Sequence, residues 1–328
     1  MGGNKVLDST RFLTQNPQYV FINHDKIWEV AGRYSKEDLK IPRWNFGEHP
    51  SENEKFEDVV DTFFLCNSIN FAFTDFETGE KFKSYHKGEE FVGSSAMWAC
   101  VKHAIENGTP LLDADYLANF SEDDMEYVFS GNIKIPMFNE RIYVLNQVGK
   151  VLKNKYDGHF HNLLSASKGK MFGRNGVVKR LTRDFDSFND SFLYGNDKKV
   201  EFNKRAQLAG GMLYGRFQNT NRHPLFSDVD ESTVAADYVL PKGLRDMGIF
   251  IYEESLAERV DGRKLIPAYF QEELEIRAST IHACNEIVEI LNEKYGKNVN
   301  AWHIYAKIWS EARKNKETRH HLTRTIAY

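Results

Sequence analysis

Hydrophobic residues recur every three or four positions through most of the chain, which is the spacing of amphipathic helices. Ser121 and Asp124 add the spacing of a capping box, in which two side chains close the first turn of a helix. The predicted helices run from residue 94 or 95 up to 108, from 121 to 129, and over residues 139–156, 202–217, 272–295 and 302–312.

A different pattern covers residues 69–74, where large apolar residues alternate with small or polar ones. This period of two predicts a half-buried β-strand. A turn signal at residues 77–79 and apolar residues between 82 and 92 predict one or two more short strands. We therefore expect a mainly α chain of the α+β class, forming one domain over residues 1–328, with a small antiparallel β-sheet inserted at about residues 63–93.

The balance of charged residues indicates whether the chain binds a long nucleic acid or a small molecule. The 328 residues include 43 Lys and Arg against 47 Asp and Glu, for a net charge of −4. Proteins that bind long nucleic acids neutralise many phosphates with clustered cations, so we expect no stable nucleic-acid complex. A single nucleotide needs only one or two cations, so a small-molecule nucleotide substrate is compatible with this composition.

Cysteine use and the lack of long apolar runs bear on location. Cys66, Cys100 and Cys284 lie far apart and form no CxxC pair, so the sequence indicates neither a disulfide framework nor a zinc ribbon. The N-terminus lacks the apolar run of a signal peptide. No stretch approaches the ~18 apolar residues of a membrane span. We expect a cytoplasmic monomer that does not associate with membranes.

Common catalytic motifs are missing from the sequence, which contains no GxGxxG after a strand, no GxxxxGK[ST] loop, no HExxH and no GxSxG. His159 and His161 are two residues apart, but no third ligand of the right type lies near them in the sequence. We therefore interpret them as surface histidines rather than as a metal site. Aromatic residues make up 13% of the chain, which predicts either an aromatic-rich core or a stacking pocket for a planar ligand.

Four segments resemble the queuosine salvage family, in that family's order and spacing over roughly residues 12–328. They are Ala236-Asp237-Tyr238-Val239-Leu240-Pro241, Phe202-Asn203-Lys204-Arg205-Ala206-Gln207, Ser68-Ile69-Asn70-Phe71-Ala72-Phe73 and Glu273-Leu274-Glu275-Ile276-Arg277. The resemblance implies hydrolysis of queuosine 5′-phosphate to queuine and ribose 5-phosphate for queuine salvage into tRNA modification, without a metal or another cofactor. It also implies a largely helical fold, distantly similar to that of helical DNA glycosylases.

Chemistry and resemblance together assign the catalytic role to Asp237. Cleavage of an N-glycosidic bond builds positive charge on the ribose, which a nearby carboxylate stabilises while it orients or activates the attacking water. Pro241 disfavours helix at Leu240 and suits the first turn of the next helix, so Asp237 is expected on a loop that enters a helix. The alternative role is a helix cap. The place of Asp237 in the most specific of the four segments favours catalysis.

Lys204 and Arg205 are adjacent on a predicted helix, where their side chains diverge by about 100° and cannot both face one site. Lys204 shares a face with Gln207 and Gly211, and glycine lets a ligand or backbone approach closely. We assign Lys204 to the site, in contact with the ribose, its phosphate or Asp237. Arg205 is expected to support the structure, and a solvated helix face is the alternative for both cations.

Three further residues are expected to bind the substrate. Asn70 and Phe71 point to opposite sides of the predicted strand, so only one of them faces a given pocket directly. Asn70 would hydrogen-bond a base or sugar, whereas Phe71 would stack on the base or, as its residue type favours, fill the core. Tyr238 would stack on the base or donate a hydrogen bond to it.

Arg277 and Glu140 complete the predicted substrate contacts. Arg277 lies four residues after Glu273, a spacing that favours an intrahelical pair as much as a substrate contact. Queuine is a 7-deazapurine with a cationic amine on its cyclopentenediol arm, so an acidic residue near that arm would give selectivity over guanine nucleotides. Glu140 is the candidate for that acid.

Two other functions compete with the nucleotide hydrolase. A glycosylase acting on a base within DNA or RNA would bring a basic face and salt-dependent binding, and only the basic C-terminal tail supports it. A non-catalytic binding protein for a modified nucleoside would keep an aromatic pocket without needing Asp237.

Overall fold

The computed structural model describes residues 4–195, 197–222, 225–315 and 317–328. These residues form fourteen α-helices and three antiparallel sheets of two strands each, which confirms the mainly α class with small β elements. The helices are α1 (Lys5–Gln15), α2 (His24–Tyr34), α3 (Phe56–Ser68), α4 (Ser94–Glu106), α5 (Ala114–Ala118), α6 (Glu122–Val128), α7 (Phe138–Lys155), α8 (Phe160–Ala166), α9 (Val177–Asp184), α10 (Lys204–Arg216), α11 (Val239–Asp246), α12 (Glu254–Asp261), α13 (Gln271–Glu293) and α14 (Ala301–Ala312). The strands are β1 (Val20–Ile22), β2 (Lys83–His86), β3 (Glu89–Val92), β4 (Ser191–Tyr194), β5 (Lys198–Glu201) and β6 (Phe250–Tyr252).

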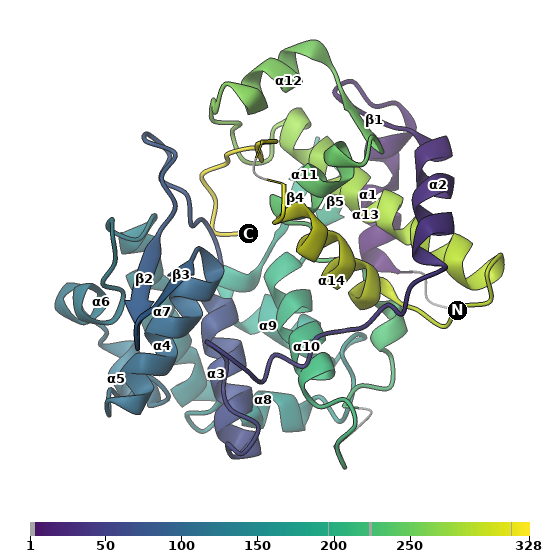
Figure 1. The fold of residues 1–328 in the computed structure, drawn as a ribbon. Coiled ribbons are helices and arrows are strands. Elements are labelled where there is room, and N and C mark those ends of the chain that lie inside the picture. The colour runs from purple at the N-terminus through teal and green to yellow at the C-terminus, as the bar shows by residue number, and fades with distance from the viewer. Residues whose placement is uncertain (1–3, 196, 223–224, 316) are drawn as a thin grey trace.

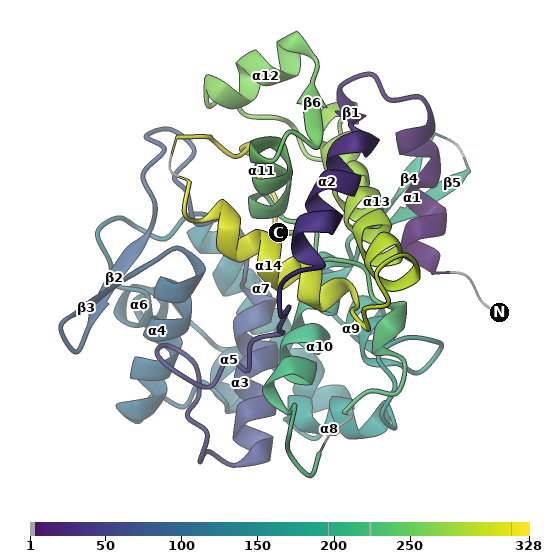
Figure 2. The ribbon, with the colours of Figure 1, turned by 45° about the vertical axis from the view of Figure 1, so that its right-hand side comes forward.

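The helices form two groups, with α10 and α14 between them (Figure 1). Helices α3 to α8 gather on one side, and α1, α2, α12 and α13 gather on the other. In the turned view of Figure 2, β4 and β5 lie beside α1, and β1 pairs with β6 near α12. Among the helices described, none combines the length and the apolar character that a bilayer crossing requires.

Three helices run through the interior and carry charged side chains into it. Every residue is buried over 59–68 of α3, 204–213 of α10 and 272–281 of α13. Because a buried charge is costly unless hydrogen bonds or opposite charges satisfy it, these side chains fix the geometry around them. The charged residues buried on the three helices are Asp61, Lys204, Arg205, Arg216, Glu272, Glu273, Glu275 and Arg277.

The predicted helices are confirmed as α4, α6, α7, α10, α13 and α14, with their ends shifted by one or two residues. Ser121 and Asp124 make the reciprocal hydrogen bonds of a capping box at the start of α6. The start of α4 differs from the prediction, because its N-cap is Gly93 with a φ of 66° and no serine side chain caps it. Glycine adopts this left-handed conformation without a steric penalty.

The strand predicted over residues 69–74 is wrong. Helix α3 continues to Ser68, and residues 69–73 have no strand partner within the described chain. Ala72 has a φ of 43°, which interrupts the alternation of a strand, and Thr74 alone forms an isolated bridge, with Lys81. The short strands predicted between residues 82 and 92 are confirmed as the antiparallel β2–β3 hairpin, whereas the β1–β6 and β4–β5 pairs are two small sheets that the sequence analysis did not predict.

Arg141 explains how an extended segment stays buried without a neighbouring strand. Its side chain is fully buried, and its guanidinium donates hydrogen bonds to the carbonyl oxygens of Ile69, Phe71 and Ala72. It also lies over the Phe71 and Phe73 rings, 4.4 and 5.0 Å from their centroids. One side chain from α7 therefore satisfies the backbone acceptors that a strand partner would otherwise satisfy.

Replacing Arg141 with lysine is expected to lower the free energy of unfolding by about 3 kcal/mol or more, because one ammonium cannot serve three buried carbonyls and each unsatisfied one costs about 1–3 kcal/mol. Urea unfolding measures the change. The matched control is Arg324→Lys, since Arg324 pairs with Glu140 near the surface. We expect that control to lose less than about 1 kcal/mol. Equal losses in the two variants would contradict the proposed role of Arg141.

Candidate active site

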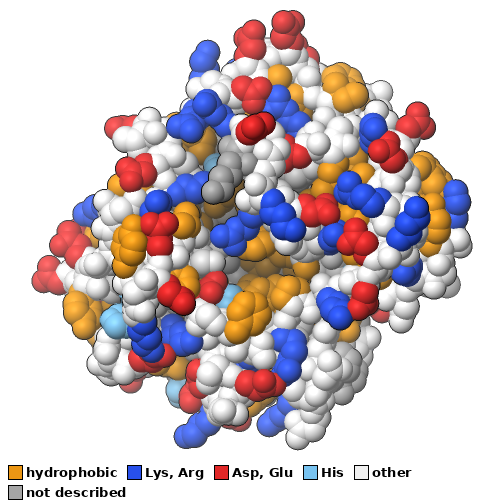
Figure 3. Space-filling model, in the orientation of Figure 1, with side chains coloured by type: hydrophobic (Ala, Val, Ile, Leu, Met, Phe, Trp, Pro, Cys, Tyr) orange, Lys and Arg blue, Asp and Glu red, His pale blue; other side chains and the backbone are white. Residues whose placement is uncertain are grey.

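A cavity of about 370 Å³ lies where α4, α10, α11, α14 and the segment 70–73 meet. That volume lies within the range of small-molecule sites. Figure 3 shows this face of the molecule hollowed near its centre, with hydrophobic side chains gathered there and basic side chains beside them. The aromatic lining residues are Trp44, Phe46, Phe71, Phe73, Trp98, Tyr238, Tyr305, Trp309 and Tyr328. The aromatic content of the chain therefore serves a cavity as well as the core.

Asp237 lies at the wall of this cavity, at the entrance to α11, and its side chain is buried. Its Oδ1 accepts hydrogen bonds from the backbone N–H groups of Val239 and Leu240, at 2.7 and 3.1 Å. The capping role considered from the sequence is therefore observed, and it occupies only one of the two carboxylate oxygens. Within the described residues Oδ2 has no hydrogen-bond partner. Burial raises the pKa of Asp237, and the positive charge of Lys204 opposes that rise.

Lys204 is the first residue of α10 and lines the same cavity, with only 4% of its surface exposed. The described residues place no acidic oxygen within 4.0 Å of its ammonium, so the direct pair with Asp237 that the sequence allowed is not formed. Burial lowers the pKa of Lys204 to about 8, although the charge of Asp237 acts in the opposite direction. A buried cation without an ion-pair partner is suited to binding an anionic ligand.

Asp190 positions the start of α10. Its Oδ2 accepts a hydrogen bond from the backbone N–H of Lys204 at 3.1 Å. The guanidinium of Arg277 binds both oxygens of Asp190, at 3.0 and 2.5 Å, and also contacts Glu273 at 3.4 Å. Arg277 is not among the residues that line the cavity, and its observed partners are Asp190 and, through the intrahelical pair, Glu273. Asp190 was missed from the sequence because it lies far from Arg277 along the chain and belongs to no motif.

Arg205 and Gly211 have structural roles. Arg205 is buried and donates hydrogen bonds to the carbonyls of Ser68 and Ser187, as expected of a supporting residue. A Cβ atom on Gly211 would lie 2.2 Å from the Trp302 ring. Gly211 therefore makes room for a tryptophan rather than for a ligand, which corrects the interpretation of the helix face that it shares with Lys204.

Asn70 and Phe71 both reach the cavity, because the backbone around them is not a regular strand. Asn70 donates a hydrogen bond to Asn67 Oδ1 at 3.3 Å. The Phe71 side chain is fully buried, with the guanidinium groups of Arg141 and Arg205 4.4 and 5.1 Å from its ring centroid. Phe71 is therefore mainly a core residue, as its residue type favoured.

Tyr238 lines the cavity and packs against the His320 ring, with centroids 4.4 Å apart. Glu140 is not among the lining residues and pairs with Arg324 instead. The second carboxylate of the cavity is Glu48, whose side chain is 16% exposed. No sequence pattern indicated Glu48, because it lies in an irregular segment without hydrophobic periodicity.

An aromatic cavity that holds ionisable groups with shifted pKa values is typical of enzymes that act on small planar molecules. The family model of the queuosine salvage protein matches residues 48–328, so the chain belongs to that family. The match includes Asp237, Lys204 and Glu48.

Curated relatives align along most of the chain. A protein of Sphaerobacter thermophilus is 33% identical over 98% of this chain and 97% of its own length. One of Nematostella vectensis is 31% identical over 85% of this chain and 84% of its own length. One of Bos taurus is 25% identical, with 98% of each chain covered. All three are named queuosine 5′-phosphate N-glycosylase/hydrolase.

Anion binding in the cavity is expected to weaken above about pH 8, where the Lys204 ammonium loses its proton. Sulfate keeps its charge in this range, so its apparent Kd should rise about tenfold per pH unit above the pKa. Calorimetric titrations between about pH 6.5 and about pH 9.5 measure this. Lys204→Met should bind sulfate weakly at every pH, whereas Lys87→Met, at a surface pair with Glu106, should behave as wild type. Unchanged pH dependence in Lys204→Met would contradict the assignment.

Proposed function

We propose that this chain is an enzyme that hydrolyses the N-glycosidic bond of queuosine 5′-phosphate, releasing queuine and ribose 5-phosphate for salvage into tRNA modification. The observation that carries the proposal is the buried carboxylate of Asp237, which keeps Oδ2 available at the wall of an aromatic cavity. The names of the curated relatives support it. The proposed reaction uses no metal or other cofactor.

In the proposed reaction the bond between the ribose and the deazapurine nitrogen breaks, and its electron pair leaves with the base. The carboxylate of Asp237 stabilises the positive charge that develops on the sugar. Water forms the new bond to the sugar and gives up a proton, while the departing base takes one up. Because queuine has carbon in place of N7, the base cannot be activated by protonation there, and stabilising the ribosyl cation carries more of the catalysis.

The cations of the cavity serve the anionic end of the substrate. Lys204 contacts the ribose or its 5′-phosphate, and its charge also opposes the rise in the pKa of Asp237 that burial causes. Lys81 and Arg313 line the same cavity and supply further positive charge for a phosphate dianion. Tyr238 stacks on the deazapurine, and the amide of Asn70 hydrogen-bonds the base or the sugar.

The proposal extends to domain organisation, oligomeric state, location and the size of the substrate. It acts as a single domain over residues 1–328 and as a monomer in the cytoplasm, on a free nucleotide rather than within a stable nucleic-acid complex. The net charge of −4 supports a small substrate over a polynucleotide.

Asp237→Asn is expected to bind queuosine 5′-phosphate but to release queuine at least about a hundredfold more slowly, the typical worth of such a group. Asparagine caps a helix as well as aspartate does, so this change removes the charge and keeps the cap. Chromatography of free queuine measures the rate. The matched control is Asp113→Asn, because Asp113 caps α5 outside the cavity.

The same assay separates the competing functions. If wild type releases queuine and Asp237→Asn releases it at the same rate, Asp237 is not a catalytic residue. Release only from a base within a polynucleotide would indicate a nucleic-acid glycosylase. Tight binding without any release would indicate a binding protein.

Glu48 is the residue that we propose to bind the cationic amine of the cyclopentenediol arm, in place of Glu140. It lies in the cavity and is largely shielded from solvent, where a carboxylate binds an ammonium more strongly than at the surface. Glu140 is instead paired with Arg324.

Glu48→Gln is expected to lower kcat/KM for queuosine 5′-phosphate by about tenfold or more, because a charge-assisted hydrogen bond becomes a neutral one. The same change should have little effect on 7-deazaguanosine 5′-phosphate, which lacks the arm. Glu140→Gln should leave both substrates unaffected. Equal losses for the two substrates in Glu48→Gln would show that Glu48 does not recognise the amine.

A further inference from the structure

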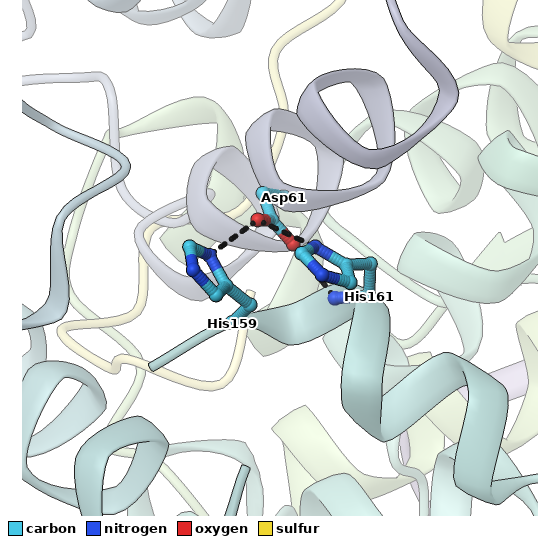
Figure 4. A group of neighbouring side chains, drawn as sticks. All are labelled: Asp61, His159 and His161. Atoms are coloured by element: carbon cyan, nitrogen blue, oxygen red, sulfur yellow. Dashed lines mark hydrogen bonds and ion pairs between the residues drawn. The ribbon is translucent and has the colours of Figure 1, made fainter. Parts of the chain in front are cut away.

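Asp61, on α3, has two histidines around its carboxylate. The Nδ1 atoms of His159 and His161 lie 3.1 and 3.0 Å from the same oxygen, Oδ2. The backbone N–H of His161 donates to the other oxygen, Oδ1, at 2.7 Å. Figure 4 shows both imidazoles turned toward the carboxylate, and their rings stack with centroids 4.7 Å apart. The three side chains offer ligand atoms that all lie within 4.8 Å of one another.

The fold thus brings to the two histidines a third potential ligand that lies far from them in the sequence. His159 precedes α8 and His161 lies in its first turn, whereas Asp61 comes from α3, about a hundred positions earlier. A search along the chain around the two histidines cannot detect such a partner. Their interpretation as surface histidines misses this contact, although His159 is 46% exposed.

The charge of the Asp61 carboxylate lacks a permanent counter-ion. Its side chain is 7% exposed, and leucines including Leu65 and Leu117 line a small void beside it. Within the described residues no lysine or arginine forms an ion pair with Asp61, and its partners are histidines that are charged only when protonated. A buried carboxylate is costly without a cation, and a divalent ion would supply the missing charge.

We propose that Asp61, His159 and His161 bind a divalent transition-metal ion such as Zn²⁺. Asp61 Oδ2 and the two Nδ1 atoms are the ligands, and water completes the coordination on the exposed side of His159. Two imidazoles and one carboxylate are a ligand set that zinc and its neighbours in the first transition row accept. The N–H of His161 on Oδ1 orients the carboxylate from outside the ligand shell.

The ion has a structural role, because none of the three residues lines the cavity that holds Asp237. It ties α8 to α3, the helix that leads directly into the Asn70 segment. Bound metal therefore stabilises the fold and takes no part in breaking the glycosidic bond.

The test uses full-length protein without a polyhistidine tag, stripped of metal with a chelator and dialysed. Zinc is then titrated by calorimetry, and the Tm is measured with and without zinc. We expect one ion per chain and a Tm raised by about 3 °C or more at saturating zinc. His159→Gln and His161→Gln should each weaken zinc binding at least about tenfold and abolish the rise in Tm.

The control is His24→Gln, because His24 forms a similar contact with one carboxylate, Glu286, at 2.9 Å but has no second histidine. That variant should bind zinc as wild type does. No zinc binding by wild type, or binding that survives in both His159→Gln and His161→Gln, would overturn the proposal. Binding and Tm are measured without any substrate, so these outcomes are independent of the proposed hydrolase activity.

Discussion

Asp237 and Lys204 are a carboxylate and an ammonium, both buried, that line one cavity without forming an ion pair among the described residues. A direct pair would satisfy both charges and leave neither for a ligand, whereas their separation leaves each open to a group of opposite charge. Such an arrangement lasts only if other contacts prevent collapse into a pair. Two N–H groups of α11 hold Asp237, and Asp190 holds the backbone at the start of the helix that carries Lys204.

Three buried guanidinium groups fix the walls around this pair. Arg141 holds the backbone of the segment that carries Asn70, Arg205 joins the end of α3 to the short 3-10 helix Asp186–Phe188 before β4, and Arg277 holds Asp190. Each joins elements far apart in the sequence through hydrogen bonds to buried acceptors. A guanidinium offers five donors in a rigid plane, so one side chain orders several backbone groups at once. These contacts connect the segments that form the walls of the cavity.

A feature could be predicted from the sequence when the residues that form it lie close together along the chain. Helices follow from apolar spacing within one segment, and Asp237 and Lys204 lie in motifs that can be found locally. The contacts of Asp190 and Asp61 and the place of Glu48 in the cavity were missed because they depend on residues that only the fold brings close. The predicted strand failed for the same reason, since the residue that replaces its partner lies about seventy positions away. Local sequence patterns predict the helices, whereas the conformation of an irregular segment such as residues 69–73 depends on buried polar partners that lie far away in the sequence.

The two roles considered for Asp237 are compatible because a carboxylate has two oxygens. Oδ1 accepts the free N–H groups at the start of α11, so the side chain cannot rotate away from the cavity without leaving those donors unsatisfied. The cap therefore orients Oδ2 and also stabilises its negative charge, since the N-terminal end of a helix is positive. A carboxylate on a free loop would have neither property. Helix capping, the common structural explanation for such an aspartate, is here the means by which the proposed catalytic oxygen is held in place.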